Sequence, residues 1–126
     1  MYKKLINKEA KLAVIGLGYV GLPIALEFAK HINVVGFDIN QKRVDLMKSN
    51  IDPSNELEAK DFEGCDIEFT ANIDDLADVK FFIVAVPTPI DKFQAPNLDM
   101  LINASKTVGK LLKKDDIVIF ESTVYP

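Results

Sequence analysis

Short apolar runs alternate with segments of helical periodicity along most of the 126-residue chain. Runs of four to six apolar residues are typical of buried strands, whereas apolar residues at every third or fourth position are typical of amphipathic helices. This pattern predicts strands at residues 11–15, 33–37, 67–70, 81–86 and 117–120. Helices are expected at 19–30, 41–48 and 98–112, with a helical turn at 73–77 and a polar loop with about one turn at 51–64.

Two of the predicted helices have apolar positions that define the side expected to face a core. For the helix at 41–48, Asn40 is the expected N-cap, and Val44, Leu46 and Met47 form the apolar side. The last helix is expected to follow an N-cap at Asn97. Its expected apolar side consists of Leu98, Leu101, Ile102, Ser105, Val108 and Leu112.

The alternation of strands and helices predicts the fold class. Strands that are apolar on both faces are typical of a parallel sheet covered by helices on both sides. Right-handed crossovers then give an α/β, Rossmann-type doubly wound sheet with strand order 3-2-1-4-5. We expect residues 1–126 to form one domain whose sheet ends at the fifth strand. Because residues 117–120 are apolar enough for a sheet interior, we also expect self-association through this strand.

Composition and charge exclude several classes of partner. The chain has 15 Lys and Arg against 19 Asp and Glu, with no basic block, so neither a nucleic acid nor a membrane is expected to bind. The longest apolar run, at 81–86, is far too short to span a membrane. The single Cys65 excludes an internal disulfide, and the N-terminus lacks the pattern of a secretory signal. These observations favour the cytoplasm.

A glycine motif follows the first predicted strand. Gly16, Gly18 and Gly21 have the G-x-G-x-x-G spacing of a dinucleotide-binding loop. In such loops the first glycine allows a tight turn, the second lets the backbone approach a pyrophosphate, and the third lets the helix lie close to the sheet. Asp38 ends the second strand 22 residues after Gly16, near the offset of the acid that binds the adenosine ribose. An acid there repels a 2′-phosphate, so NAD is the expected cofactor. The alternative is a glycine-rich turn without a ligand.

Hydroxyl groups follow two more strands at the same edge of the predicted sheet. Ligands of this fold bind beyond the carboxyl ends of the strands, at the switch point between strands 1 and 4. Thr88 follows the fourth strand and Thr123 the fifth, so both hydroxyls are expected to face the nicotinamide half of the cofactor. The acidic pairs at 74–75 and 115–116 lack the surrounding spacing of a metal site, and no metal is expected.

Four segments together resemble one enzyme family. They are residues 13–23, 36–40, 86–91 and 121–126, which include the glycine loop, Gly-Phe-Asp-Ile-Asn, Val-Pro-Thr-Pro-Ile-Asp and Glu-Ser-Thr-Val-Tyr-Pro. Over its whole length the chain is similar to the N-terminal NAD-binding domain of the nucleotide-sugar 6-dehydrogenases, the UDP-glucose/GDP-mannose dehydrogenase family. Its ending resembles the UDP-N-acetylhexosamine branch, which makes uronic acids for capsule and O-antigen polysaccharides.

The resemblance implies an activity and a set of site residues. Family enzymes oxidise the C6 hydroxyl of a UDP-sugar to a carboxylate with two NAD⁺, through a cysteine-bound intermediate. It implies that Asp38 binds the adenosine ribose and that Arg43 lies beside that ribose or the adenine. Thr123 matches a threonine that helps to hold the catalytic water or the reacting oxygen. The implied cofactor-binding residues are Gly16, Leu17, Gly18, Tyr19, Val20, Gly21, Asp38, Arg43, Val86, Pro87, Thr88, Ser122, Thr123 and Val124.

Part of the family's machinery has no match among residues 1–126. The nucleophilic cysteine, the catalytic lysine and aspartate, and the sugar-binding domain are all without a counterpart, and Cys65 is expected to be an inert, partly buried residue. The chain is therefore expected to bind NAD without oxidising sugar, as part of an enzyme that forms a homodimer. Two alternatives share the fold: a stand-alone NAD-sensing module and a hydroxyacid-type dehydrogenase.

Overall fold

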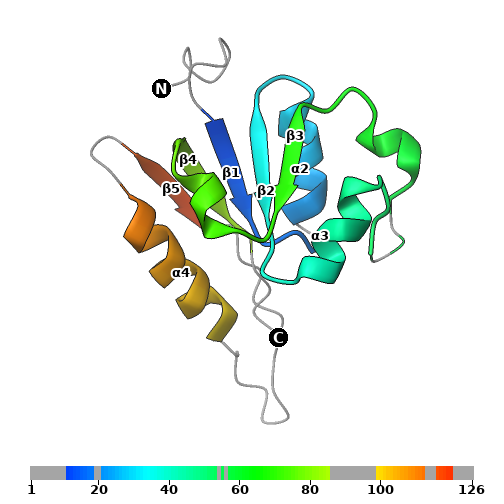
Figure 1. Ribbon diagram of the computed structural model, residues 1–126. Helices are drawn as coiled ribbons and strands as arrows, with labels where there is room; N and C mark the ends of the chain where they lie inside the picture. The colour runs from blue at the N-terminus through cyan, green and yellow to red at the C-terminus, as the bar shows by residue number, and fades with distance from the viewer. Residues whose placement is uncertain are drawn as a thin grey trace, which may run out of the picture.

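Five parallel strands form one sheet in the computed structural model, which describes residues 11–18, 21–53, 55, 57–85, 99–112 and 116–120 (Figure 1). The strand order is β3-β2-β1-β4-β5. The strands are β1 (Lys11–Ile15), β2 (Val34–Phe37), β3 (Ile67–Thr70), β4 (Val79–Val84) and β5 (Ile117–Phe120). The predicted α/β class, the parallel pairing and the strand order are confirmed.

Helices cover both faces of this sheet. The helices α2 (Gly21–Ala29) and α3 (Gln41–Lys48) lie on one face, and α4 (Asp99–Leu111) lies on the other (Figure 1). Two short 3-10 helices, η1 (Ala59–Phe62) and η2 (Ile73–Leu76), stand where isolated turns were predicted. In the ranges that the structure describes, no helix is long and apolar enough to cross a membrane.

Successive residues of β1 pack into two different apolar clusters. Leu12 and Val14 belong to the cluster under α2 and α3, whereas Ala13 and Ile15 belong to the cluster under α4. All four side chains are almost completely buried. This double burial explains why the strand is a continuous apolar run, and it fixes β1 in the centre of the sheet.

The N-terminus of α3 is fixed by a side-chain cap. Asn40 has an extended backbone, and its side-chain oxygen accepts the Arg43 N–H at 3.3 Å, as an N-cap residue does. The bounds of α3 and its cap are those predicted. Val44 and Met47 are buried as expected, but Leu46 is exposed, because it lies on the solvent side of the helix.

The fourth strand begins and ends earlier than predicted. It covers Val79–Val84 instead of 81–86, and Val79 pairs with Lys11 of β1. The start of the strand was missed because the charged Lys80 interrupts the apolar run. The backbone of Lys80 nevertheless belongs to β4. The predicted last residue, Val86, lies outside the described residues.

The fifth strand has the predicted bounds and the edge position that the predicted strand order gives it, but it is less buried than expected. Ile117 and Ile119 point to one face and are 38% and 41% exposed, while Val118 packs against the cluster under α4. Within the described part of the chain, β5 pairs with β4 alone and is an edge strand. An apolar run does not reveal whether one or both of its faces are covered, which is why the expected burial was wrong.

The buried side of α4 also differs from the prediction. Ala104 and Val108 are buried against the sheet, with Leu111 partly buried beside them, whereas Ile102 and Leu112 are exposed. The true spacing of four and three residues passes through a small alanine, which carries little hydrophobic signal. The expected positions Asn97 and Leu98 lie outside the described residues, as does the side chain of Leu101.

Candidate functional site

The glycine loop leaves the carboxyl end of β1 through a residue with positive φ. Gly16 has φ 95°, a conformation that L side chains rarely adopt, so glycine is required for this turn. The Gly16 N–H donates to the Phe37 carbonyl of β2 at 2.8 Å, which continues the β1–β2 ladder by one bond. This bond fixes the point at which the loop leaves the carboxyl edge of the sheet.

Gly21 and Gly18 serve the loop in different ways. A Cβ built on Gly21 would lie 1.7 Å from the carbonyl oxygen of Gly16, so only glycine lets α2 start this close to the loop. A Cβ built on Gly18 would meet no heavy atom of the described residues within 4 Å. The close packing predicted for Gly21 agrees with this geometry, whereas the approach of Gly18 to a pyrophosphate stays a prediction.

Asp38 lies beside this loop, directly after β2. Its Oδ2 accepts the Leu17 N–H at 3.3 Å, and its Oδ1 accepts the Asn40 N–H at 2.9 Å. The side chain is 14% exposed, so the carboxylate can still be reached from solvent. Each carboxylate oxygen has a second lone pair, and the two can accept further hydrogen bonds from a diol.

Arg43 reaches the same loop from the first turn of α3. Its Nη2 donates to the Leu17 carbonyl at 3.1 Å, and its Nε lies 3.7 Å from Oδ2 of Asp38. The two charged side chains therefore hold the N–H and the carbonyl of one loop residue. The family resemblance placed Arg43 near the site, but the sequence could not reveal this contact, which joins residues 26 positions apart.

Eight of the predicted site residues lie outside the described part of the chain, and their roles stay predictions. They are Tyr19, Val20, Val86, Pro87, Thr88, Ser122, Thr123 and Val124. The described end of β4 is held against β1, since the Ala85 N–H donates to the Ile15 carbonyl at 2.8 Å. The carboxyl end of β4 therefore lies next to the start of the glycine loop, at the switch point of the sheet.

One exposed residue next to the site was not predicted. Ile39 directly follows Asp38 and is 81% exposed, more than any other large apolar residue in the described ranges. Its sequence signal is weak, because a single isoleucine after a strand is also typical of a strand end. An apolar surface beside the Asp38 carboxylate is suited to a flat, partly apolar ring.

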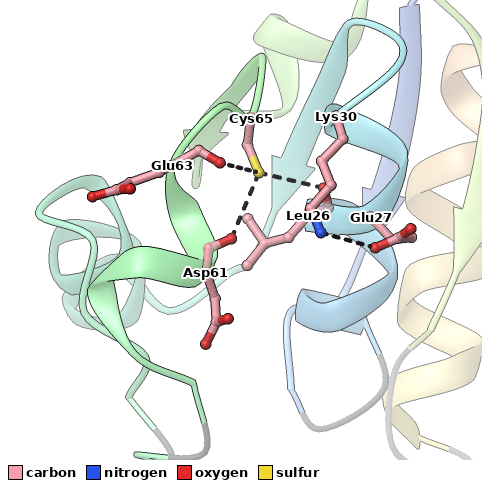
Figure 2. A network of polar contacts seen from close by, with 6 residues as sticks. All are labelled: Leu26, Glu27, Lys30, Asp61, Glu63 and Cys65. Atoms are coloured by element: carbon pink, nitrogen blue, oxygen red, sulfur yellow. Dashed lines mark hydrogen bonds and ion pairs between the residues drawn. The ribbon is translucent and has the colours of Figure 1, made fainter.

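Cys65 lies away from this site, before the start of β3. Figure 2 shows its sulfur facing three backbone carbonyl oxygens, those of Leu26 at 3.4 Å and of Asp61 and Glu63 at 3.7 Å. Burial raises the pKa of the Cys65 thiol, Lys30 lowers it to a smaller extent, and Glu27 raises it. A protonated thiol that faces carbonyl oxygens is a poor nucleophile, which agrees with the inert role predicted.

A pocket of about 320 Å³ opens between the end of α3 and the start of β3. Its lining residues are Met47, Lys48, Asn50, Phe62, Cys65, Ile67, Glu68 and Phe69. None of them belongs to the glycine loop or to its acid. Within the ranges that the structure describes, no group of three or more histidine, cysteine or acidic residues could hold a metal ion.

The arrangement defines the class of this domain. A glycine loop with open backbone above it, and an acid at the next strand end, both at the switch point of a 3-2-1-4-5 sheet, fit a dinucleotide. The domain is a Rossmann-type dinucleotide-binding domain. Its residues 10–126 match the model of the UDP-glucose/GDP-mannose dehydrogenase family, NAD binding domain, so the chain belongs to this family.

Known proteins of the family are similar along most of the chain. UDP-N-acetyl-D-glucosamine 6-dehydrogenase of Pseudomonas aeruginosa is 53% identical over 94% of the chain, and Protein CapL of Staphylococcus aureus is 50% identical over 91%. A solved structure of NDP-N-acetyl-D-galactosaminuronic acid dehydrogenase from Methanosarcina mazei superposes with a TM-score of 0.84, at 25% identity over 98% of the chain. The chain spans only 28%, 27% and 30% of these three proteins.

Proposed function

We propose that this chain is the cofactor-binding part of an NAD-dependent UDP-sugar 6-dehydrogenase that acts on a UDP-N-acetylhexosamine. The observation that supports it most directly is the open backbone at Gly18 beside the accessible carboxylate of Asp38. Membership of the family supplies the cofactor class. The choice of sugar is supported by relatives named UDP-N-acetyl-D-glucosamine 6-dehydrogenase at 53% and 48% identity.

Each part of the dinucleotide has a proposed place. The pyrophosphate lies over the loop from Gly16 to Gly21, the adenosine ribose binds Asp38, and the adenine covers Ile39. Bound NAD⁺ supplies the hydride acceptor for the oxidation of the sugar C6 hydroxyl. The chain's own task is to bind and orient it. The residues proposed around the nicotinamide are Val86, Pro87, Thr88, Ser122, Thr123 and Val124.

The oxidation of sugar is proposed to need residues other than those of this chain. Cys65 has a raised pKa and lies before β3, away from the carboxyl ends of the strands, so it is unsuited to capture an aldehyde at the cofactor. The sugar-binding groups and the nucleophile are proposed to belong to the remaining length that the relatives have. A homodimeric enzyme in the cytoplasm, supplying uronic acids for capsule or O-antigen polysaccharide, completes the proposal.

The two alternatives are less well supported. A stand-alone NAD sensor would share the glycine loop and Asp38, but the similar proteins named above are dehydrogenases. A hydroxyacid-type dehydrogenase would share the fold, yet the family model that matches residues 10–126 describes a different class of substrate.

Calorimetric titration of NAD⁺ into the chain tests the proposed site. Asp38→Ala removes the ribose acceptor, and hydrogen bonds to a charged group contribute about 1.5–3 kcal/mol, so we expect the affinity to fall about 10- to 100-fold. Asp45→Ala is the matched control, because it removes an equal charge from an exposed position of α3 that contacts Gln41. Binding by Asp38→Ala as tight as by the unchanged chain would refute the ribose assignment.

A second measurement tests the proposal that the oxidation of sugar needs residues other than those of this chain. We expect no NADH absorbance at 340 nm when the chain is mixed with NAD⁺ and UDP-N-acetylglucosamine. Steady NADH formation by this chain alone would show that its own residues supply the nucleophile.

A further inference from the structure

Asp38 and Arg43 together hold the two peptide groups on either side of Leu17. The carboxylate accepts the Leu17 N–H at 3.3 Å, and the guanidinium donates to the Leu17 carbonyl at 3.1 Å. The two charged groups also face each other, with 3.7 Å between Nε of Arg43 and Oδ2 of Asp38. Two partners therefore hold the guanidinium toward the glycine loop.

A guanidinium at this place has a second possible use. In Rossmann-type proteins that prefer NADP, an arginine near the end of the second strand accommodates the 2′-phosphate of the adenosine ribose. Its planar group forms paired hydrogen bonds with a phosphate, which a lysine does not. Arg43 is 30% exposed and lies next to the ribose acid, so the correct chemical group is already present. Its contacts turn it away from that use.

We propose that Arg43 is a latent 2′-phosphate ligand, and that Asp38 keeps it from this role. The inference rests on the proposed function, because it requires the adenosine ribose to bind at Asp38. The carboxylate acts twice: it repels a 2′-phosphate, and it retains the guanidinium on the loop. Among the described residues, removal of its charge leaves Arg43 with the neutral bond to Leu17, and the guanidinium can then turn toward a phosphate.

The neighbouring Lys42 provides an internal control for charge. It carries the same charge as Arg43, is exposed, and precedes Arg43 by one residue in α3. Adjacent residues of a helix point in directions about 100° apart, so Lys42 does not share the contacts of Arg43 with the loop. A general gain in affinity for anions would depend on both residues, whereas a built 2′-phosphate site depends on Arg43.

Calorimetric titrations of NAD⁺ and NADP⁺ into four versions of the chain test the proposal. They are the unchanged chain, Asp38→Asn, Asp38→Asn with Arg43→Gln, and Asp38→Asn with Lys42→Gln. Asparagine keeps an oxygen that can accept the Leu17 N–H, so the loop retains its support. If Asp38→Asn does not fold by circular dichroism, Asp38→Ser replaces it, because its hydroxyl can also accept that bond. Adenosine 2′,5′-bisphosphate and 5′-AMP repeat the comparison on the adenosine half.

We expect the unchanged chain to bind NAD⁺ at least tenfold more tightly than NADP⁺. Asp38→Asn should bind NADP⁺ about tenfold more tightly than the unchanged chain does, and the added Arg43→Gln should abolish that gain. The added Lys42→Gln should change it by less than about threefold. The proposal is overturned if the gain survives Arg43→Gln, or if Asp38→Asn gains nothing while the unchanged chain binds NAD⁺. Failure of the unchanged chain to bind either dinucleotide refutes the proposed function, and this inference with it.

Discussion

The contact between Gly21 and Gly16 gives the sharpest test of how the loop is built. In Gly21→Ala the new Cβ would lie 1.7 Å from the Gly16 carbonyl oxygen, 2.8 Å from its carbon and 3.4 Å from Cβ of Ala85. Real Cβ atoms essentially never come within 3.0 Å of another heavy atom. The start of α2 must therefore retreat from the loop by about 1.3 Å, and the atoms in its way are backbone, which cannot turn aside.

The cost of this retreat is large for one methyl group. Overpacking of a well-packed region costs about 1–3 kcal/mol and occasionally more, and the rigid backbone contact places Gly21→Ala near 3 kcal/mol. That is a substantial share of the roughly 5–15 kcal/mol that stabilises a typical domain. For a chain of this length, we expect the melting temperature to fall by roughly 10 °C.

The matched variant is Gly18→Ala, which adds the same methyl group three residues earlier. Because no atom from the described ranges lies within 4 Å of its Cβ, the free energy of unfolding should change by less than about 0.5 kcal/mol. NAD⁺ binding should nevertheless weaken, since the methyl occupies the surface that the pyrophosphate approaches. Urea unfolding followed by circular dichroism, with calorimetric titration of NAD⁺, separates the two effects. Equal unfolding midpoints for Gly21→Ala and Gly18→Ala would refute the reasoning.

Two further predictions concern residues away from the loop. The raised pKa of Cys65 lowers its thiolate fraction, so iodoacetamide should alkylate the folded chain more slowly than the urea-unfolded chain at pH 8, as measured by mass spectrometry. Glu27→Gln should speed this reaction and Lys30→Gln should slow it, and an unchanged order of rates would contradict the assignment. In α4, a Cβ built on Gly109 meets no atom within 4 Å in the part of the chain that the structure describes, so Gly109→Ala should raise the free energy of unfolding by about 0.5–1 kcal/mol. A lower urea midpoint for this variant would show that the glycine has an unseen role.

The parts of the fold that the sequence predicted correctly are those encoded locally. The strands β1, β3 and β5, the helix α3 and its Asn40 cap follow from short runs and from one capping residue, and their bounds agree with the prediction. The glycine loop and Asp38 could also be recognised from the sequence, because their spacing reflects the length of one strand-helix-strand unit.

The parts that could not be predicted depend on distant neighbours. The bond from Arg43 to Leu17 requires α3 and the end of β1 to meet, which no local pattern states. The buried side of α4 includes Ala104. Its small side chain is so weakly hydrophobic that it hardly stands out from polar neighbours in a helical pattern. The exposure of Ile117 and Ile119 depends on what covers one face of β5, and an apolar run alone contains no information about that.

The central place of β1 has a consequence for how the chain folds during synthesis. Of the five strands, β1 is synthesised first, but its two neighbours in the sheet lie at very different distances along the sequence. Leu12 pairs with Val34 of β2 on one side and with Phe81 of β4 on the other. At translation rates of roughly 5–20 residues per second, the second partner appears roughly 2–10 seconds after the first. Contacts between residues so far apart also close slowly, because of the entropy of the intervening loop. For several seconds a nascent chain therefore has an apolar strand that is paired along one edge only. This is the state in which the chain most needs a chaperone.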